Sequence, residues 1–172
     1  MNAIHTPVRT MRKLRISVTD HCQFRCLYCM PDDPQFTPPA NFLDFNEIVA
    51  IVRGLQAHGI DTIRITGGEP LLRPGLPSLV YRLKALGIRH VGLSTNGHLL
   101  TASLAKEFKA AGLDAFNISL DTLNPTVCQQ INKVKVLKKV LTAIDLAVDT
   151  GLPTRTNTVV RRGQNAEELP AI

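Results

Sequence analysis

Short runs rich in β-branched residues alternate along this 172-residue chain with longer amphipathic stretches, and this alternation constrains the fold more than any other feature. The short runs predict strands over residues 14–19, 62–66, 90–95, 115–120 and 156–160. Apolar residues recur at helical spacing over residues 45–55, 76–86, 104–111 and 136–148. Strands separated by helices pair in parallel through right-handed crossovers. The chain is therefore predicted to be an α/β protein with a parallel sheet of about five strands and flanking helices.

Glycines mark the ends of the predicted helices. Gly87, Gly112 and Gly151 each follow the apolar part of a helical stretch, where a C-terminal cap is expected. Either Asp44 or Asn46 would cap the start of the first helix. The pattern alone does not separate a doubly wound sheet from a (β/α) barrel, so both architectures stay open at this point.

Composition limits the classes of protein to which the chain can belong. Apolar residues make up 44% and charged residues 20%, which is the composition of a globular domain. No run reaches about 18 apolar residues and no apolar signal segment precedes Asp20, so we expect no membrane contact and a cytoplasmic location. The net charge of +6 suits a nucleic-acid or phosphate-bearing ligand. Aromatic residues are only 5%, which disfavours a platform for nucleic-acid bases.

Three of the four cysteines, Cys22, Cys26 and Cys29, cluster directly after the first predicted strand. Thiolates ligate [4Fe–4S] clusters, and three of them would leave one iron open to a substrate or cofactor. Zinc usually takes four ligands, so a zinc site would also need His21 or Cys128. A trio of free structural thiols is the remaining alternative. Cys128 has no partner at a metal-binding spacing, and we assign it no role.

Polar motifs follow the predicted strands. Gly67-Gly68-Glu69, Ser94-Thr95-Asn96-Gly97 and Ser119-Leu120-Asp121 each lie at or just past a strand end. The C-terminal ends of the strands carry the active site in (β/α) barrels. Segments far apart in the sequence are therefore predicted to meet at one site.

Two arginines lie inside predicted strands, where a charge is costly unless it is paired. Arg15 and Arg64 each stand between apolar neighbours. One interpretation is a buried ion pair with Asp20 or Glu69. The other is that both side chains point into a barrel and bind phosphate or guanine, since the guanidinium fork matches phosphate geometry.

The order and content of these motifs resemble the radical S-adenosylmethionine (SAM) enzymes, and among them the GTP 3′,8-cyclase family of molybdenum cofactor (molybdopterin) biosynthesis. The resemblance extends over about residues 11–169 and is carried by residues 14–31, 63–73, 94–97, 117–123 and 157–165. It implies that residues 1–172 form a radical SAM core domain, an incomplete (β/α) barrel of radical SAM type. This domain would be truncated before the last barrel strand and the C-terminal second-cluster region.

The resemblance also implies roles for individual residues, with none catalytic beyond the cluster. The ligands of a [4Fe–4S] cluster with one open iron would be Cys22, Cys26 and Cys29. The contacts to SAM would be Tyr28, Gly68 and Ser119. The contacts to GTP would be Arg15, Arg64, Thr95 and Arg155. Arg155 stands where the family usually has lysine, and residues 131–134, Ile-Asn-Lys-Val, depart from the family's Ile-Thr-Gly-Arg.

Each of these positions also has a structural interpretation. The two glycines could serve a tight turn, Tyr28 could pack, and Ser119 could bond only to backbone. The charge run of Lys133, Lys135, Lys138 and Lys139 is most simply a solvated helix face.

The reaction implied by the resemblance begins when a reduced cluster passes one electron to SAM. The S–C5′ bond of SAM then breaks to give methionine and a 5′-deoxyadenosyl radical. This radical takes the 3′ hydrogen of GTP, and the ribose carbon attacks C8 of guanine. The product is (8S)-3′,8-cyclo-7,8-dihydroguanosine 5′-triphosphate. The implied partners are a reductant such as flavodoxin or ferredoxin, a downstream cyclic pyranopterin monophosphate synthase and a second copy in a homodimer.

The family carries a second cysteine cluster, whose ligands are absent from this sequence. We therefore expect that these 172 residues alone do not complete the cyclisation. The alternatives are a radical SAM enzyme with another substrate, such as a peptide, and an inactive module that binds zinc or nucleic acid.

Overall fold

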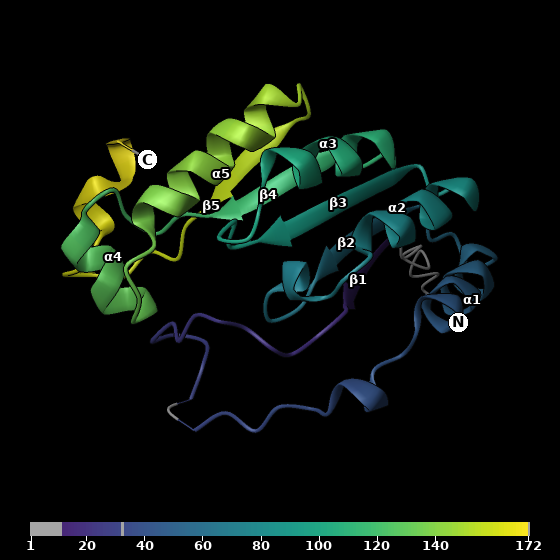
Figure 1. The fold of residues 1–172 in the computed structure, drawn as a ribbon, viewed down its shortest axis with the longest axis horizontal. Helices are drawn as coiled ribbons and strands as arrows, with labels where there is room; N and C mark the ends of the chain where they lie inside the picture. The colour runs from purple at the N-terminus through teal and green to yellow at the C-terminus, as the bar shows by residue number, and fades with distance from the viewer. Residues whose placement is uncertain (1–11, 32, 172) are drawn as a thin grey trace, which may run out of the picture.

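The computed structural model describes residues 12–31 and 33–171, and at its centre is a five-stranded parallel sheet (Figure 1). The strands are β1 (Lys13–Ser17), β2 (Thr62–Thr66), β3 (His90–Thr95), β4 (Ala115–Ser119) and β5 (Thr154–Asn157). They lie side by side in chain order, and every neighbouring pair is parallel. A doubly wound sheet reverses its strand order at a switch point. The unbroken order is instead that of a (β/α) barrel wall, which resolves the alternative that the sequence leaves open.

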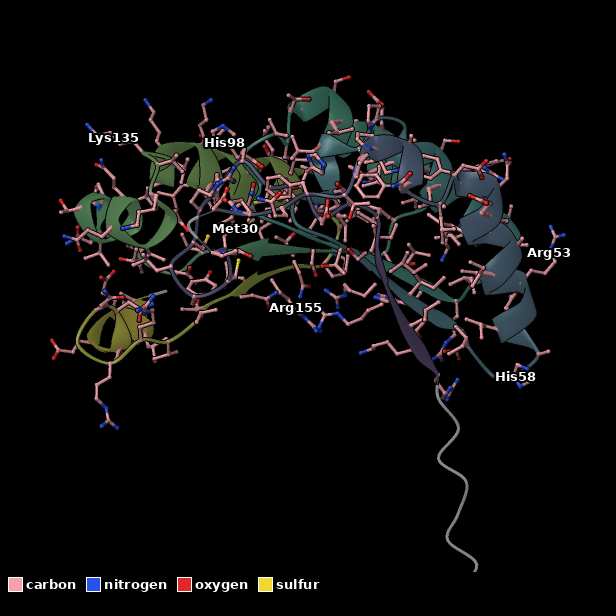
Figure 2. The ribbon with its side chains drawn as sticks, turned by 90° about the horizontal axis from the view of Figure 1, so that it is seen from below. Met30, Arg53, His58, His98, Lys135 and Arg155 are labelled. Atoms are coloured by element: carbon pink, nitrogen blue, oxygen red, sulfur yellow. The ribbon has the colours of Figure 1, made fainter. Side chains whose placement is uncertain are left out.

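Helices cover one face of this sheet (Figure 2). They are α1 (Phe45–Gln56), α2 (Leu76–Ala85), α3 (Ala102–Ala110) and α5 (Leu137–Asp149), close to the predicted ranges. Asp44 caps α1 in a reciprocal pair with Glu47, which selects one of the two expected caps. Phe108 of α3 meets Phe116 of β4 edge to face in the core, with ring centroids 6.0 Å apart. In the part of the chain that the structure describes, no helix has the length and apolar character to cross a membrane.

The opposite face of the sheet is polar. The strand register places Arg15 beside Arg64, and Ser94 beside Asn117, which in turn pairs with Arg155. Because side chains alternate along a strand, these residues share the face that the four helices leave uncovered. Figure 2 shows Arg155 on that side, pointing away from the helices. Parallel sheets ordinarily have both faces covered, so a polar face fits the interior of an incomplete barrel.

The last strand lies earlier than predicted. The sequence predicts a strand over residues 156–160, whereas β5 ends at Asn157, where its pairing with Ser119 of β4 ends. Beyond that point the backbone turns away, and the amide of Val159 donates to the side chain of Asp121 at 2.9 Å. Residues 167–169, which resemble a helix start, lie in the 3-10 helix η3 (Ala166–Ala171). Two further 3-10 helices, η1 (Pro39–Asn41) and η2 (Pro70–Leu72), follow β1 and β2.

An additional helix, α4 (Pro125–Asn132), occupies a stretch where the sequence analysis predicts none. Asn124 caps it by accepting from the amides of Thr126 and Val127, and proline fills its first position. The helix ends at Lys133, whose φ of 63° makes it the single left-handed non-glycine residue among those described.

The lysine run is exposed, as predicted, but it is not one helix face. Lys138 and Lys139 lie on α5, whereas Lys133 and Lys135 lie in the loop that joins α4 to α5. The reason is the left-handed turn at Lys133, which ends α4 and separates the first two lysines from the helix that follows.

Replacing Lys133 by glycine is expected to stabilise the fold. A non-glycine residue in the left-handed region destabilises the folded state by about 1 kcal/mol, and glycine removes this cost. Glycine also increases the entropy of the unfolded chain, which offsets part of the stabilisation. We expect Lys133→Gly to raise the free energy of unfolding by about 0.5–1 kcal/mol in urea titrations. Lys135→Gly, in the same loop but with negative φ, should lower it. A lower stability of Lys133→Gly than of the unmodified chain would contradict the argument.

Candidate functional site

The carboxyl ends of the strands open onto a cavity of about 250 Å³. Segments from the ends of all five strands reach it, so the predicted convergence on one mouth is confirmed. Of the residues with a predicted role in binding the cluster, SAM or GTP, those that line it are Arg15, Cys22, Cys26, Tyr28, Cys29, Gly68, Thr95 and Ser119. Arg64 and Arg155 lie outside this lining, on the polar face of the sheet.

The three clustered cysteines differ in exposure. Cys26 is buried, Cys22 is half-buried and Cys29 is exposed. The amides of Cys29 and Met30 both donate to the carbonyl of Cys26, at 3.1 and 3.0 Å, which curls the loop around that residue. Burial raises the pKa of Cys26 to about 12, and it raises the pKa of Cys22 as well. Metal binding to these thiols would therefore displace protons.

The cysteines line the cavity but do not meet at one point. Among residues 12–31 and 33–171, no three His, Cys, Asp or Glu side chains are placed to hold a single metal ion. His21, which could have completed a zinc site, does not line this cavity. Its ring stacks on Phe36 at 4.7 Å, and its Nε2 lies 3.0 Å from the carbonyl oxygen of Thr37.

Gly67 and Gly68 bring the end of β2 against the backbone that leads into the cysteine loop. The amide of Gly68 donates to the carbonyl of Thr19 at 2.7 Å, and the amide of Glu69 donates to that of His21 at 2.7 Å. A Cβ added to Gly68 would lie only 2.3 Å from the His21 carbonyl oxygen. Close backbone packing therefore requires glycine here, beyond the turn that the sequence suggests.

Glu69 is fully buried and joins β2 to β3. Its Oε1 accepts from the Thr95 hydroxyl at 2.6 Å and from the Leu71 amide at 3.0 Å, and its Oε2 accepts from the Asn96 amide at 2.7 Å. Burial raises the pKa of Glu69, and the three hydrogen bonds oppose that rise. The Thr95 hydroxyl also accepts from the Gly97 amide at 3.0 Å. Glu69 and Thr95 together therefore stabilise the backbone at the end of β3.

The three arginines of the polar face have no carboxylate partner among the described residues. Arg64 donates to the Ser94 hydroxyl at 3.4 Å. Burial lowers the pKa of Arg64, and the neighbouring charges of Arg15 and Arg155 lower it further. Like charges gathered on one face are unfavourable unless an anion neutralises them. The face is therefore suited to an anionic ligand.

The predicted alternative of buried ion pairs is wrong. Neither arginine inside the strands reaches Glu69, which is occupied by donors from the end of β3 and the residue after it. Asp20 accepts from the Thr37 amide at 2.7 Å, and its other oxygen lies 3.7 Å from Nε2 of His21. These carboxylates follow the strands along the chain, whereas the arginine side chains lie on the open face of the sheet.

Tyr28 and Asp121 connect the cysteine loop to the end of β4. The Tyr28 hydroxyl donates to Asp121 at 2.7 Å, and burial together with this carboxylate raises the pKa of Tyr28 well above its usual value. The Asp121 carbonyl accepts from the Asn165 side chain at 2.7 Å. Neither Asp121 nor Asn165 was predicted from the sequence to have a role in the site. The position of Asp121 directly after a strand was the available signal.

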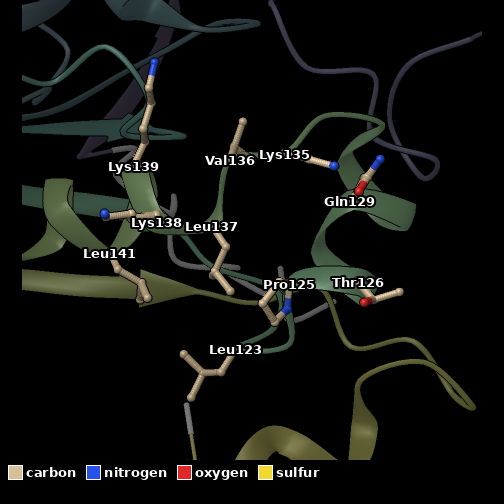
Figure 3. A pocket seen from close by; sticks show the side chains of 10 residues that line it. All are labelled: Leu123, Pro125, Thr126, Gln129, Lys135, Val136, Leu137, Lys138, Lys139 and Leu141. Carbon is tan, nitrogen blue, oxygen red and sulfur yellow. The ribbon is translucent and has the colours of Figure 1, made fainter.

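A larger groove of about 750 Å³ lies between α4 and the start of α5 (Figure 3). Its lining includes Lys135, Lys138 and Lys139 together with apolar residues such as Leu141. None of the predicted site residues lines it. It adjoins the cysteine cavity through Leu137, which lines both.

Residues 16–172 match the family model of the Radical SAM superfamily. The chain is 44% identical to GTP 3′,8-cyclase 1 of Pseudomonas aeruginosa, over 95% of this chain and 50% of that protein. It is 46% identical to molybdenum cofactor biosynthesis protein 1 of Homo sapiens, over 91% of this chain and 25% of that protein. The chain thus spans 50% of the length of the bacterial relative and 25% of the length of the human one.

Solved structures show the same fold at low sequence identity. Methylornithine synthase (PylB) superposes with a TM-score of 0.74 at 15% identity, over 94% of this chain and 48% of that one. The structure of anSMEcpe with bound AdoMet gives a TM-score of 0.68 at 17% identity, over 93% and 48% of the two chains. Both likenesses support the incomplete barrel.

Replacing Glu69 by glutamine is expected to destabilise the fold. In either orientation the amide nitrogen of glutamine would face a hydrogen-bond donor, from Asn96 or from Thr95 and Leu71. We expect Glu69→Gln to lower the free energy of unfolding by about 1–3 kcal/mol in urea titrations. Glu167→Gln, an exposed change of the same kind, should stay within about 0.5 kcal/mol of the unmodified chain. Equal stability of the two variants would show that the carboxylate is not needed.

Proposed function

Since this chain belongs to the radical SAM superfamily, we propose that it binds a [4Fe–4S] cluster and SAM in the cysteine cavity and GTP on the arginine face, as part of a GTP 3′,8-cyclase. The observation that carries the proposal is the position of Arg15. It lines the cavity together with Cys22, Cys26 and Cys29, and it stands in register with Arg64 on the open face. A cluster site and an anion site are therefore continuous.

The cysteines suit a cluster. Each thiolate of a [4Fe–4S] cluster binds a different iron, so its ligands enclose a volume rather than meet at a single point. All three cysteines line the same cavity, which supports this arrangement of ligands. When bound, the cluster and SAM supply one-electron chemistry that generates an organic radical, which no side chain of this protein supplies.

Three residues of the cavity would bind and orient SAM. The Gly68 amide already donates to the Thr19 carbonyl, so the group of Gly68 that would bind SAM is its own carbonyl. This carbonyl would accept from the ammonium group of SAM. The Ser119 hydroxyl is exposed at the cavity and would donate to the carboxylate. The Tyr28 ring is held by its hydrogen bond to Asp121 and would border the adenine.

The arginines would bind GTP. Arg15, Arg64 and Arg155 offer planar guanidinium groups that match phosphate oxygens, and their mutual repulsion would be relieved by a triphosphate. Thr95 already donates its hydroxyl hydrogen to Glu69 and would contribute to GTP binding only as an acceptor. The unpaired arginines favour GTP over the other substrate classes, such as peptides, that radical SAM enzymes use.

The names of the relatives support the place of this reaction in molybdenum cofactor biosynthesis. A flavodoxin or ferredoxin as reductant, the downstream cyclic pyranopterin monophosphate synthase, a homodimer and a cytoplasmic location stay predictions. The same holds for a second cluster in the family and for the inability of these 172 residues to complete cyclisation alone.

Cluster assembly is the first test. Protein reconstituted without oxygen is expected to hold about four irons and four sulfides per chain. The EPR signal of the reduced protein should change when SAM is added, because one iron is free to bind it. Cys26→Ala should lose most of the iron. Zinc in place of iron, or no metal at all, would contradict the proposal and favour an inactive metal-binding module.

GTP binding is the second test. Arg64→Ala should weaken GTP binding by about 10- to 100-fold in equilibrium dialysis, since it removes charge-assisted hydrogen bonds to phosphate. Arg53→Ala is the matched control, because Arg53 is exposed on α1, away from the arginine face (Figure 2). The loss should shrink at high salt. Equal weakening by both variants would mean that only net charge matters.

A further inference from the structure

Asn132, the last residue of α4, contacts two cysteines at once. The Cys26 thiol donates to its Oδ1 at 3.1 Å, and its Nδ2 donates to Sγ of Cys128 at 3.4 Å. Asn132 and Cys128 are both buried and line the cavity that Cys26 lines. The fourth cysteine, which has no spacing partner in the sequence, is therefore connected to a cluster ligand through a single amide.

The backbone holds this contact in place. The amide of Arg25 donates to the carbonyl of Asn132 at 3.1 Å, and the amide of Leu27 donates to that of Ile131 at 3.0 Å. These two hydrogen bonds lie on either side of Cys26. The cysteine loop is thus paired with the end of α4, and Asn132 stays beside Cys26.

A ligating cysteine would reverse this hydrogen bond. A cysteine bound to iron is a thiolate, which has no hydrogen to donate and is repelled by an amide oxygen. Rotation of the Asn132 amide by half a turn exchanges its oxygen and nitrogen. Nδ2 then faces Cys26, and Oδ1 faces Cys128. A thiol can both donate and accept, so Cys128 satisfies either orientation of the amide.

We propose that Asn132 is a positioning residue that donates a hydrogen bond to Cys26 Sγ when that sulfur binds iron, and that the Cys128 thiol supports this orientation by donating to Oδ1 of the amide. The inference rests on the proposed cluster at Cys22, Cys26 and Cys29. Hydrogen bonds to the sulfurs of an iron–sulfur cluster favour its more negative, reduced state and so raise its reduction potential. The pair would therefore make the cluster easier to reduce.

A redox titration of the reconstituted 172-residue chain, followed by EPR, tests this inference. Asn132→Leu keeps a similar shape without hydrogen bonds and should shift the midpoint to lower potential. Cys128→Ala should shift it in the same direction by a smaller amount. Cys128→Ser retains a group that donates and accepts, and should stay near the unmodified protein. Gln130→Leu, on the exposed part of α4, is the matched control and should cause no shift.

Pulsed EPR in D2O gives a second readout. The Phe24 amide and the Asn96 side chain also contact a cluster ligand, Cys22 Sγ, and their deuterons should couple in every variant. The unmodified protein and Gln130→Leu should show one further exchangeable deuteron coupled to the cluster, which Asn132→Leu lacks. An unchanged potential and a retained deuteron in Asn132→Leu would overturn the inference while leaving the proposed cluster intact. If Asn132→Leu assembles no cluster, the inference is tested with Cys128→Ala instead. An unchanged reduction potential in Cys128→Ala would then overturn the inference. Failure of the unmodified chain to hold iron would instead overturn the proposed function, and this inference with it.

Discussion

The buried carboxylate of Glu69 is the interaction on which the arrangement of the site depends. Burying a carboxylate is costly unless donors surround it, and here the Thr95 hydroxyl and the amides of Asn96 and Leu71 do so. The backbone of the same segment, at Gly68 and Glu69, bonds to Thr19 and His21 just before the cysteine loop. One short segment therefore holds the end of β3 through a side chain and the cysteine loop through its backbone. Two of the donors are backbone amides, which have no side-chain rotamers. The carboxylate therefore fixes the backbone positions of the segments that supply them.

One face of the sheet stabilises the fold, and the other carries the arginines of the candidate site. The face that packs against the helices carries residues such as Ile63, Ile65 and Phe116, which exclude water and stabilise the fold. The other face carries Arg15, Arg64 and Arg155, whose charges would be unfavourable in a closed core. Strand alternation alone produces this separation, since successive side chains point to opposite sides. The open polar face and the cysteine cavity then share one edge, at Arg15.

Much of the fold and part of the site could be predicted from the sequence, and the failures have physical causes. The strands and four helices were predictable because they are periodic, and β5 was misplaced because its end depends on pairing with β4. Helix α4 is only eight residues long, so its apolar residues repeat over too short a stretch to be recognised as a helix, although Asn124 and Pro125 gave a start signal. A buried ion pair with Asp20 or Glu69 was one of two interpretations of the strand arginines, and it was wrong because the register places Arg15 beside Arg64 on the open face. Asn132 was missed because its contact with Cys26 joins residues 106 positions apart.

The sequence by itself determined the class of the fold and the chemistry of the ligands. Alternating strand and helix periods require a parallel sheet, and the spacing of Cys22, Cys26 and Cys29 places three thiols on one short loop. These are local properties, because each is contained in a few consecutive residues. Only the tertiary structure decided that the strands follow one another in chain order, that Cys26 is buried while Cys29 is exposed, and that Cys128 reaches the cavity. Those outcomes depend on which distant segments pack together, and no period or spacing within one segment records that choice.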